Sequence, residues 1–189
     1  MEEEKIRSFI ALDLDSATKD FLEEIVTKWK KRYPQAKWVR KDQLHVTLAF
    51  FPAIPVGCTR NIGRILEELG NRFPSFYPDL SKIGVFPSWN RVRVLWVGFD
   101  EDGEKRMKQI GEVLLQNLKG EGITVEEDKK ELVPHITLAR LRYPVSFSPA
   151  DWKIETPPVA AIRRIALFQS TLTPQGPIYK ELFAFDLKG

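Results

Sequence analysis

The chain of 189 residues contains two histidines, His45 and His135, and each begins the same five-residue pattern. The first reads His-Val-Thr-Leu-Ala over 45–49 and the second reads His-Ile-Thr-Leu-Ala over 135–139. β-Branched and apolar residues in such a run favour a strand, in which successive side chains point to opposite faces. We call the first four residues of each segment, His-Val-Thr-Leu and His-Ile-Thr-Leu, the tetrads. The alternation predicts that each tetrad exposes its His and Thr on one face and buries its apolar residues on the other. The repeated setting predicts a duplicated fold with one paired site.

The segments that precede the tetrads also repeat. A strand over 9–12 and a helix capped by Asp15 or Ser16 lead to the first tetrad, while a strand over 94–99 and a helix after 100–103 lead to the second. We therefore expect one domain, 1–189, with an internal repeat over approximately 6–52 and 92–142 and two pseudo-symmetric lobes. A third helix is expected over 59–73, further strands over 76–85, 162–168 and 179–185, and a loop over 144–158. Segregated helices and hairpin-like strands indicate an α+β fold class.

Composition limits the class of protein. Hydrophobic residues make up 43% and charged residues 29%, which is typical of a globular protein, and no apolar run approaches membrane-spanning length. The first residues lack the order of a secretory signal, so a cytoplasmic location is expected. The lone Cys58 has no internal disulfide partner. The net charge of +3 is compatible with a phosphate-bearing ligand.

Two histidines on one face can remove one proton and deliver another, because imidazole titrates near pH ~6.5. Hydrolysis of a phosphodiester needs both steps, and Thr47 and Thr137 could donate hydrogen bonds to phosphoryl oxygens. Zinc usually takes three or four protein ligands, and no further metal-binding motif accompanies the two histidines. We therefore expect neither a metal nor a cofactor.

Several stretches together resemble a known family. They are Arg7-Ser8-Phe9-Ile10-Ala11, Leu44 to Phe50, Val85-Phe86-Pro87, Arg93 to Trp96, Pro134 to Arg140, and Ser170, Leu172, Gly176 and Tyr179. The pattern is similar to that of the 2H phosphoesterases, and within them the RNA 2′,3′-cyclic phosphodiesterases, also called 2′-5′ RNA ligases. The resemblance covers nearly the whole chain. It implies a bilobal fold in which each lobe is an antiparallel sheet backed by helices, with the active-site cleft between the lobes.

The resemblance also implies a function and roles for individual residues. Such enzymes hydrolyse RNA 2′,3′-cyclic phosphate ends to 2′-phosphomonoesters without a metal, and some ligate 2′,5′-linked RNA halves in vitro. His45 would be the proton donor and His135 the proton acceptor. Phe50 and Arg140, each five residues after its histidine, would contact substrate. Strict alternation would put Arg140 on the face opposite His135, so we expect the strand to end or bulge before it.

Aromatic side chains near the tetrads are candidates for stacking on a base. We consider Phe50, Trp89 and Tyr143 on the basis of their sequence positions. After the first tetrad and Ala49 the chain continues as Phe50-Phe51-Pro52, where similar sequences commonly have Phe-Leu-Gly. This difference predicts a differently shaped loop, which would affect substrate length and base preference.

Other functions remain open at the level of sequence. The same histidines could cleave 2′,5′-oligoadenylate or a small cyclic nucleotide. A different class of function is a non-catalytic RNA-end binding module, in which the tetrads hold a phosphate without turnover. In each case we expect a monomer whose partner is RNA or a nucleotide, with no membrane association.

Overall fold

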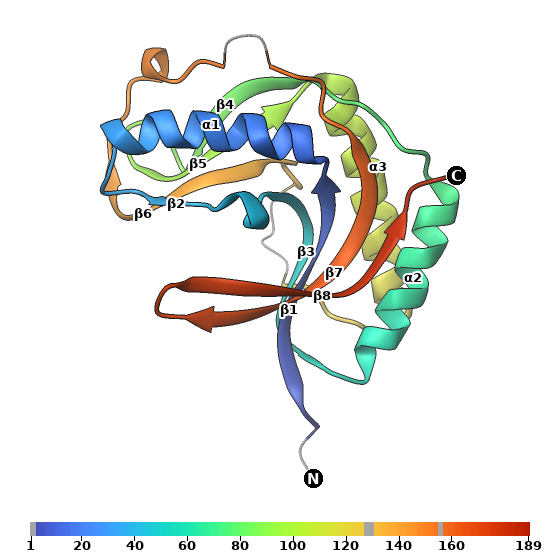
Figure 1. Cartoon of the computed structure of the whole chain (residues 1–189). Coiled ribbons are helices and arrows are strands. Elements are labelled where there is room, and N and C mark those ends of the chain that lie inside the picture. The colour runs from blue at the N-terminus through green and yellow to red at the C-terminus, as the bar shows by residue number, and fades with distance from the viewer. Residues whose placement is uncertain (1–2, 127–130, 155–156) are drawn as a thin grey trace.

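The computed structural model describes residues 3–126, 131–154 and 157–189, which form an α+β fold (Figure 1). Its strands form one antiparallel sheet in the order β4-β5-β6-β3-β1-β7-β8, and the short β2 pairs with β6. The strands are β1 (Lys5–Leu14), β2 (Lys37–Trp38), β3 (His45–Pro55), β4 (Leu80–Phe86), β5 (Val92–Phe99), β6 (Ile136–Val145), β7 (Ile162–Thr173) and β8 (Gly176–Asp186). The α-helices are α1 (Ser16–Arg32), α2 (Cys58–Arg72) and α3 (Glu101–Gly120), and η1 (Lys41–Gln43) and η2 (Pro149–Asp151) are single 3₁₀ turns. The predicted fold class is confirmed.

α1 begins where the sequence predicts, and α3 begins at Glu101, within the segment 100–103 that the sequence predicts to precede it. The carboxylate of Asp15 accepts a hydrogen bond from the backbone N–H of Thr18 at 3.2 Å and caps α1. Asp100 accepts one from the N–H of Gly103 at 3.3 Å and caps α3. Both bonds satisfy N–H groups that have no partner within the helix. Each capped helix therefore follows directly on its strand, β1 or β5.

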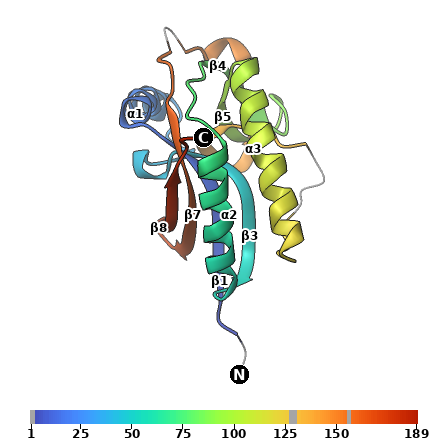
Figure 2. The same ribbon diagram turned by 90° about the vertical axis from the view of Figure 1, so that its right-hand side faces the viewer.

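One large core joins the helices to the sheet. Figure 2 shows α2 and α3 running side by side along the molecule. Their buried apolar residues, with those of α1, pack in a single cluster with the apolar residues of the two tetrads. The tetrad residues in this core are Val46, Leu48, Ile136 and Leu138. The helices therefore cover the side of the tetrads that does not carry the histidines.

The two units that the sequence predicts as a repeat are neighbours in the order of the strands. The units β1-α1-β3 and β5-α3-β6 place their tetrad strands, β3 and β6, next to each other near the middle of the sheet. Outward from this pair lie β1 and β7 on one side and β5 and β4 on the other. The sheet is continuous across the junction, so the division into two lobes and the domain bounds 1–189 stay predictions. In the described part of the chain, no helix has the length and apolar character needed to cross a membrane.

Candidate active site

The two tetrads meet at a single register pair between β3 and β6, Val46 opposite Ile136. Both of these side chains are fully buried, whereas the histidine and threonine of each tetrad are half-buried. Because side chains alternate along a strand, the pair Val46–Ile136 points into the core and its neighbours on both strands point to the opposite face. That face, which we call the histidine face, carries His45, Thr47 and their equivalents in the second tetrad.

Each tetrad contains a β-bulge at its leucine. Along β3 the partners on β1 change from Ile10–Ala49 to Ala11–Thr47, so Leu48 is an extra residue. Along β6 the partners on β5 change in the same way, from Leu95–Ala139 to Trp96–Thr137, and Leu138 is extra. An extra residue reverses the alternation beyond it.

The two bulges bring the residue five positions after each histidine to the histidine face. Phe50 is the register partner of Phe9, whose ring stacks on His45. Arg140 is the partner of Val94, which lies two residues from Trp96 on β5 and so on the same face. The bulge predicted before Arg140 is confirmed, and the equivalent β-bulge at Leu48 brings Phe50 to the same face.

Backbone carbonyl groups fix the orientation of both imidazoles. Nδ1 of His45 lies 2.7 Å from the carbonyl oxygen of Gln43, and Nδ1 of His135 lies 2.6 Å from that of Val133. A carbonyl oxygen can only accept, so each Nδ1 carries the proton and donates. Each Nε2 is then left for chemistry. Nε2 of His45 lies 3.0 Å from the Thr47 hydroxyl, which donates to it when the imidazole is neutral.

Aromatic rings hold each histidine in place. The ring of Phe9 stacks on His45 with centroids 4.7 Å apart and planes at 24°, and Tyr179 meets His45 edge-on at 5.7 Å. Around His135, the ring of Phe86 packs edge-on at 5.1 Å and that of Trp96 is tilted at 5.8 Å. Such contacts restrict the rotamers of the imidazoles.

Burial makes both histidines less basic than usual. Removal from water lowers the pKa of His45 to about 4 and also lowers the pKa of His135. The bonds to the carbonyl groups oppose this effect in both cases. The charge of His135 contributes to the lowered pKa of His45, as expected when two imidazoles share a site. Both histidines are therefore neutral at pH 7 in the ligand-free protein.

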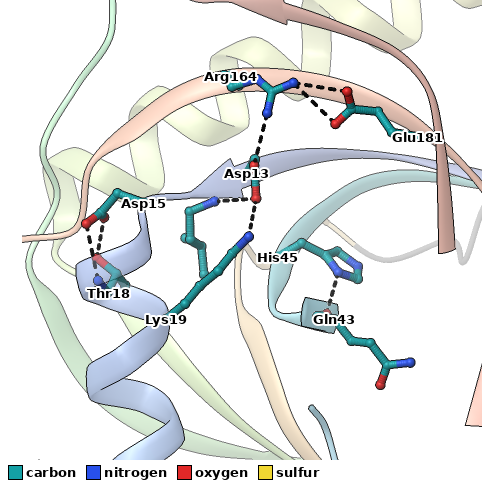
Figure 3. A network of polar contacts seen from close by, with 9 residues as sticks. Asp13, Asp15, Thr18, Lys19, Gln43, His45, Arg164 and Glu181 are labelled. Atoms are coloured by element: carbon teal, nitrogen blue, oxygen red, sulfur yellow. Dashed lines mark hydrogen bonds and ion pairs between the residues drawn. The ribbon is translucent and has the colours of Figure 1, made fainter. Parts of the chain in front are cut away.

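An ion-pair network borders His45 at the end of β1 (Figure 3). Asp13 is the register partner of His45, and its carboxylate lies 2.6 Å from Nζ of Lys19 and 3.6 Å from the guanidinium of Arg164. Arg164 in turn contacts Glu181 at 3.1 Å. Lys19 lowers and Asp13 raises the pKa of His45. The two charges act in opposite directions, and burial, the largest cause, sets the direction of the shift.

Arginine side chains from three segments act on Tyr179. Burial raises the pKa of Tyr179, and the charges of Arg140, Arg7 and Arg40 act in the opposite direction. Arg140 also lowers the pKa of His135. This side of the site is therefore positively charged and suited to an anion such as phosphate.

The structure gathers all the site residues predicted from sequence on one face, namely His45, His135, Thr47, Thr137, Phe50 and Arg140. Their catalytic and binding roles stay predictions. The other stacking candidates are placed differently. Trp89 packs against a second apolar cluster that contains Phe147 and Trp152, and Tyr143 is 70% exposed beyond the tetrad on β6.

Sequence reasoning did not identify Phe9, Phe86, Trp96 and Tyr179 as neighbours of the histidines. All four lie in stretches that carried the family resemblance, which was the available signal.

Within residues 3–126, 131–154 and 157–189, no group of three or more His, Cys, Asp or Glu side chains lies close enough together to hold a metal ion.

Comparison with known proteins decides the family. A Thermotoga maritima protein named RNA 2′,3′-cyclic phosphodiesterase is 34% identical over 97% of this chain and 97% of its own length. The profile of the LigT-like phosphoesterases matches residues 12–96. The chain belongs to this family. A second LigT-like relative with the same name, from Methanothermobacter thermautotrophicus, is 29% identical over 97% of this chain and its entire length.

Solved structures of similar proteins have the same fold. The crystal structure of the Thermus thermophilus protein TT0787 matches with a TM-score of 0.82 and 27% identity, over 97% of this chain and 99% of that one. Escherichia coli LigT, solved with 3′-AMP, matches with a TM-score of 0.74 and 22% identity, over 98% of this chain and the whole of that one. The eight-stranded sheet and its three helices are thus those of a LigT-like phosphoesterase.

Proposed function

We propose that this LigT-like protein hydrolyses RNA ends that carry a 2′,3′-cyclic phosphate and leaves a 2′-phosphomonoester. The observation that carries the proposal is the pair of imidazoles on one face, each with Nδ1 tied to a carbonyl group and Nε2 left for proton transfer. The names of the relatives support the same substrate.

In the proposed reaction, water attacks phosphorus and the bond from phosphorus to O3′ breaks. His135 takes the proton of the attacking water on Nε2, and His45 delivers a proton to the departing O3′. The product carries the phosphate on O2′ and a hydroxyl on C3′, so the elements of one water are consumed. Thr47, Thr137 and Arg140 would bind the phosphoryl oxygens as charge accumulates on them, and Phe50 would contact the nucleoside.

The assignment of donor and acceptor follows the family resemblance and places a requirement on His45. Its pKa of about 4 keeps it neutral in the free protein. As the donor, it must gain a proton when substrate binds, and the negative charge of the phosphodiester beside Nε2 favours this gain.

A substrate with sulfur in place of O3′ tests the assignment. A thiolate departs without protonation far more easily than an alkoxide, because thiols have a pKa near ~8.5. His45→Ala should therefore recover activity on the 3′-thio substrate, whereas His135→Ala should remain slow on both substrates. Recovery of the His135 variant alone would reverse the two roles.

The direct test of the reaction is incubation of a short RNA bearing a 2′,3′-cyclic phosphate with the protein in EDTA, followed by identification of the phosphomonoester. We expect turnover in EDTA, and a fall of about 10² to 10⁴ in rate for His45→Ala or His135→Ala. Complete loss of wild-type turnover in EDTA would contradict the metal-independent mechanism.

Alternative functions make different predictions in the same assay. A phosphodiesterase for 2′,5′-oligoadenylate or for small cyclic nucleotides would prefer those substrates to the RNA end. A non-catalytic RNA-end binding module would retain phosphorylated ends without forming product. Formation of 2′,5′-linked RNA from two halves would show that the site also accepts a 5′-hydroxyl in place of the attacking water and so acts as a ligase.

One chain supplies both histidines and the three arginines that act on Tyr179, so a monomer would suffice for the proposed reaction. Sedimentation of the purified protein would test this expectation. The cytoplasmic location expected from the sequence stays a prediction.

A further inference from the structure

Arg7 occupies the histidine face but has no role in the proposed chemistry. It lies on β1 two residues before Phe9, and alternation puts both side chains on the same face. Arg7 is exposed, and its guanidinium carbon sits 4.3 Å above the centre of the Phe50 ring. This cation–π contact orients an exposed cation that would otherwise sample many rotamers.

The charge of Arg7 is not neutralised by an acidic partner within the described ranges. Other arginines with defined contacts, such as Arg40 and Arg164, form ion pairs with aspartate or glutamate. Neither Arg7 nor Arg140 does so among residues 3–126, 131–154 and 157–189. Both act on the pKa of Tyr179. Two guanidinium groups on the histidine face are therefore available to anions.

These two arginines stand at different distances from the reacting groups. The charge of Arg140 acts directly on His135. Phe50, beneath Arg7, lies three residues beyond Thr47 on β3, which is roughly 10 Å along a strand. Arg7 is thus placed to bind an anion other than the cyclic phosphate that reacts at the two Nε2 atoms.

We propose that Arg7 binds the phosphodiester on the 5′ side of the terminal nucleotide, so that the site prefers an oligonucleotide end to a mononucleotide. This inference rests on the proposed function and names its substrate class more closely. An RNA chain that ends in a cyclic phosphate carries such a phosphodiester, and a nucleoside 2′,3′-cyclic phosphate does not. A guanidinium fork is suited to two oxygens of that group.

The test compares kcat/KM on two substrates, adenosine 2′,3′-cyclic phosphate and a trinucleotide ending in a 2′,3′-cyclic phosphate. Arg7→Gln should lower kcat/KM about tenfold on the trinucleotide, the usual effect of losing a charge-assisted hydrogen bond. It should leave the mononucleotide within twofold of wild type. Arg7→Lys, which keeps the charge without the fork, should fall between the two on the trinucleotide.

A matched control is Arg60→Gln, which removes the same charge from an exposed position on α2. Arg60→Gln should leave kcat/KM unchanged on both substrates. The dependence of trinucleotide kcat/KM on salt should also be shallower for Arg7→Gln, by about 0.7 in the log–log slope for one phosphate contact. If Arg7 had a purely structural role, Arg7→Gln would lower kcat/KM on both substrates by a similar factor.

If Arg7→Gln lost the same factor in kcat/KM on both substrates, or lost none on the trinucleotide, the inference would be overturned while the proposed hydrolysis stood. If wild-type protein hydrolyses neither substrate, the proposed function itself is wrong and the inference falls with it.

Discussion

Burial of His45 should make folding stability depend on pH in a way that one substitution removes. The pKa of His45 is lowered from 6.5 to about 4 by burial. Between pH 6.5 and pH 4 the unfolded chain therefore binds a proton at His45 that the folded protein does not bind. The free energy of unfolding consequently decreases as the pH falls from 6.5 toward 4. Between pH 8 and pH 5 this loss is about 2 kcal/mol.

His45→Gln should lose less stability over the same interval, because glutamine does not titrate. Urea unfolding of both proteins at pH 8 and pH 5 gives the difference directly, since the other titrating groups, including His135 and Asp15, act in both proteins. We expect the pH-dependent loss to be about 2 kcal/mol smaller in the variant. An NMR titration of wild type should place the midpoint of His45 near pH 4. Equal losses in the two proteins, or a midpoint near 6.5, would refute the reasoning.

Three further substitutions test the packing and the polar contacts of the site. In Gly84→Ala, the new Cβ would lie 2.1 Å from Cζ2 of Trp96, so the indole must shift and its packing against His135 must change. We expect a cost of about 1–3 kcal/mol in thermal unfolding and slower turnover, against no change for Gly120→Ala, where the space is open. Arg140→Lys should raise KM about tenfold in steady-state kinetics through loss of the bidentate fork, and an unchanged KM would argue against a phosphate contact. Thr47→Val keeps the side-chain volume but removes the hydroxyl bonded to Nε2, so the pH–rate profile should shift while the unfolding temperature stays within a few degrees.

The sequence by itself determined the local elements. Asp15 and Asp100 cap helices where their side chains can reach the first free N–H groups, and the buried stripe of each helix follows from the spacing of its apolar residues. The alternation within each tetrad put its histidine and threonine on one face. These features depend on contacts within a few residues, which is why a single sequence is enough to predict them.

Tertiary structure decided which distant groups share the site. The single pair Val46–Ile136 joins strands whose tetrads are far apart in the chain, and nothing local to either tetrad specifies that contact. The bulges at Leu48 and Leu138 exist only relative to β1 and β5, yet they bring Phe50 and Arg140 to the histidine face.

The chemistry of the imidazoles was also set by long-range packing. Phe9, Tyr179, Phe86 and Trp96 come from four other strand regions to enclose the two rings. Burial of the His45 ring moves its pKa to about 4. The sequence therefore determined that there are two histidines in matched strands. Only the folded chain decided that they share one partly desolvated, aromatic and positively charged site, because pairing and desolvation arise from contacts between segments distant in sequence.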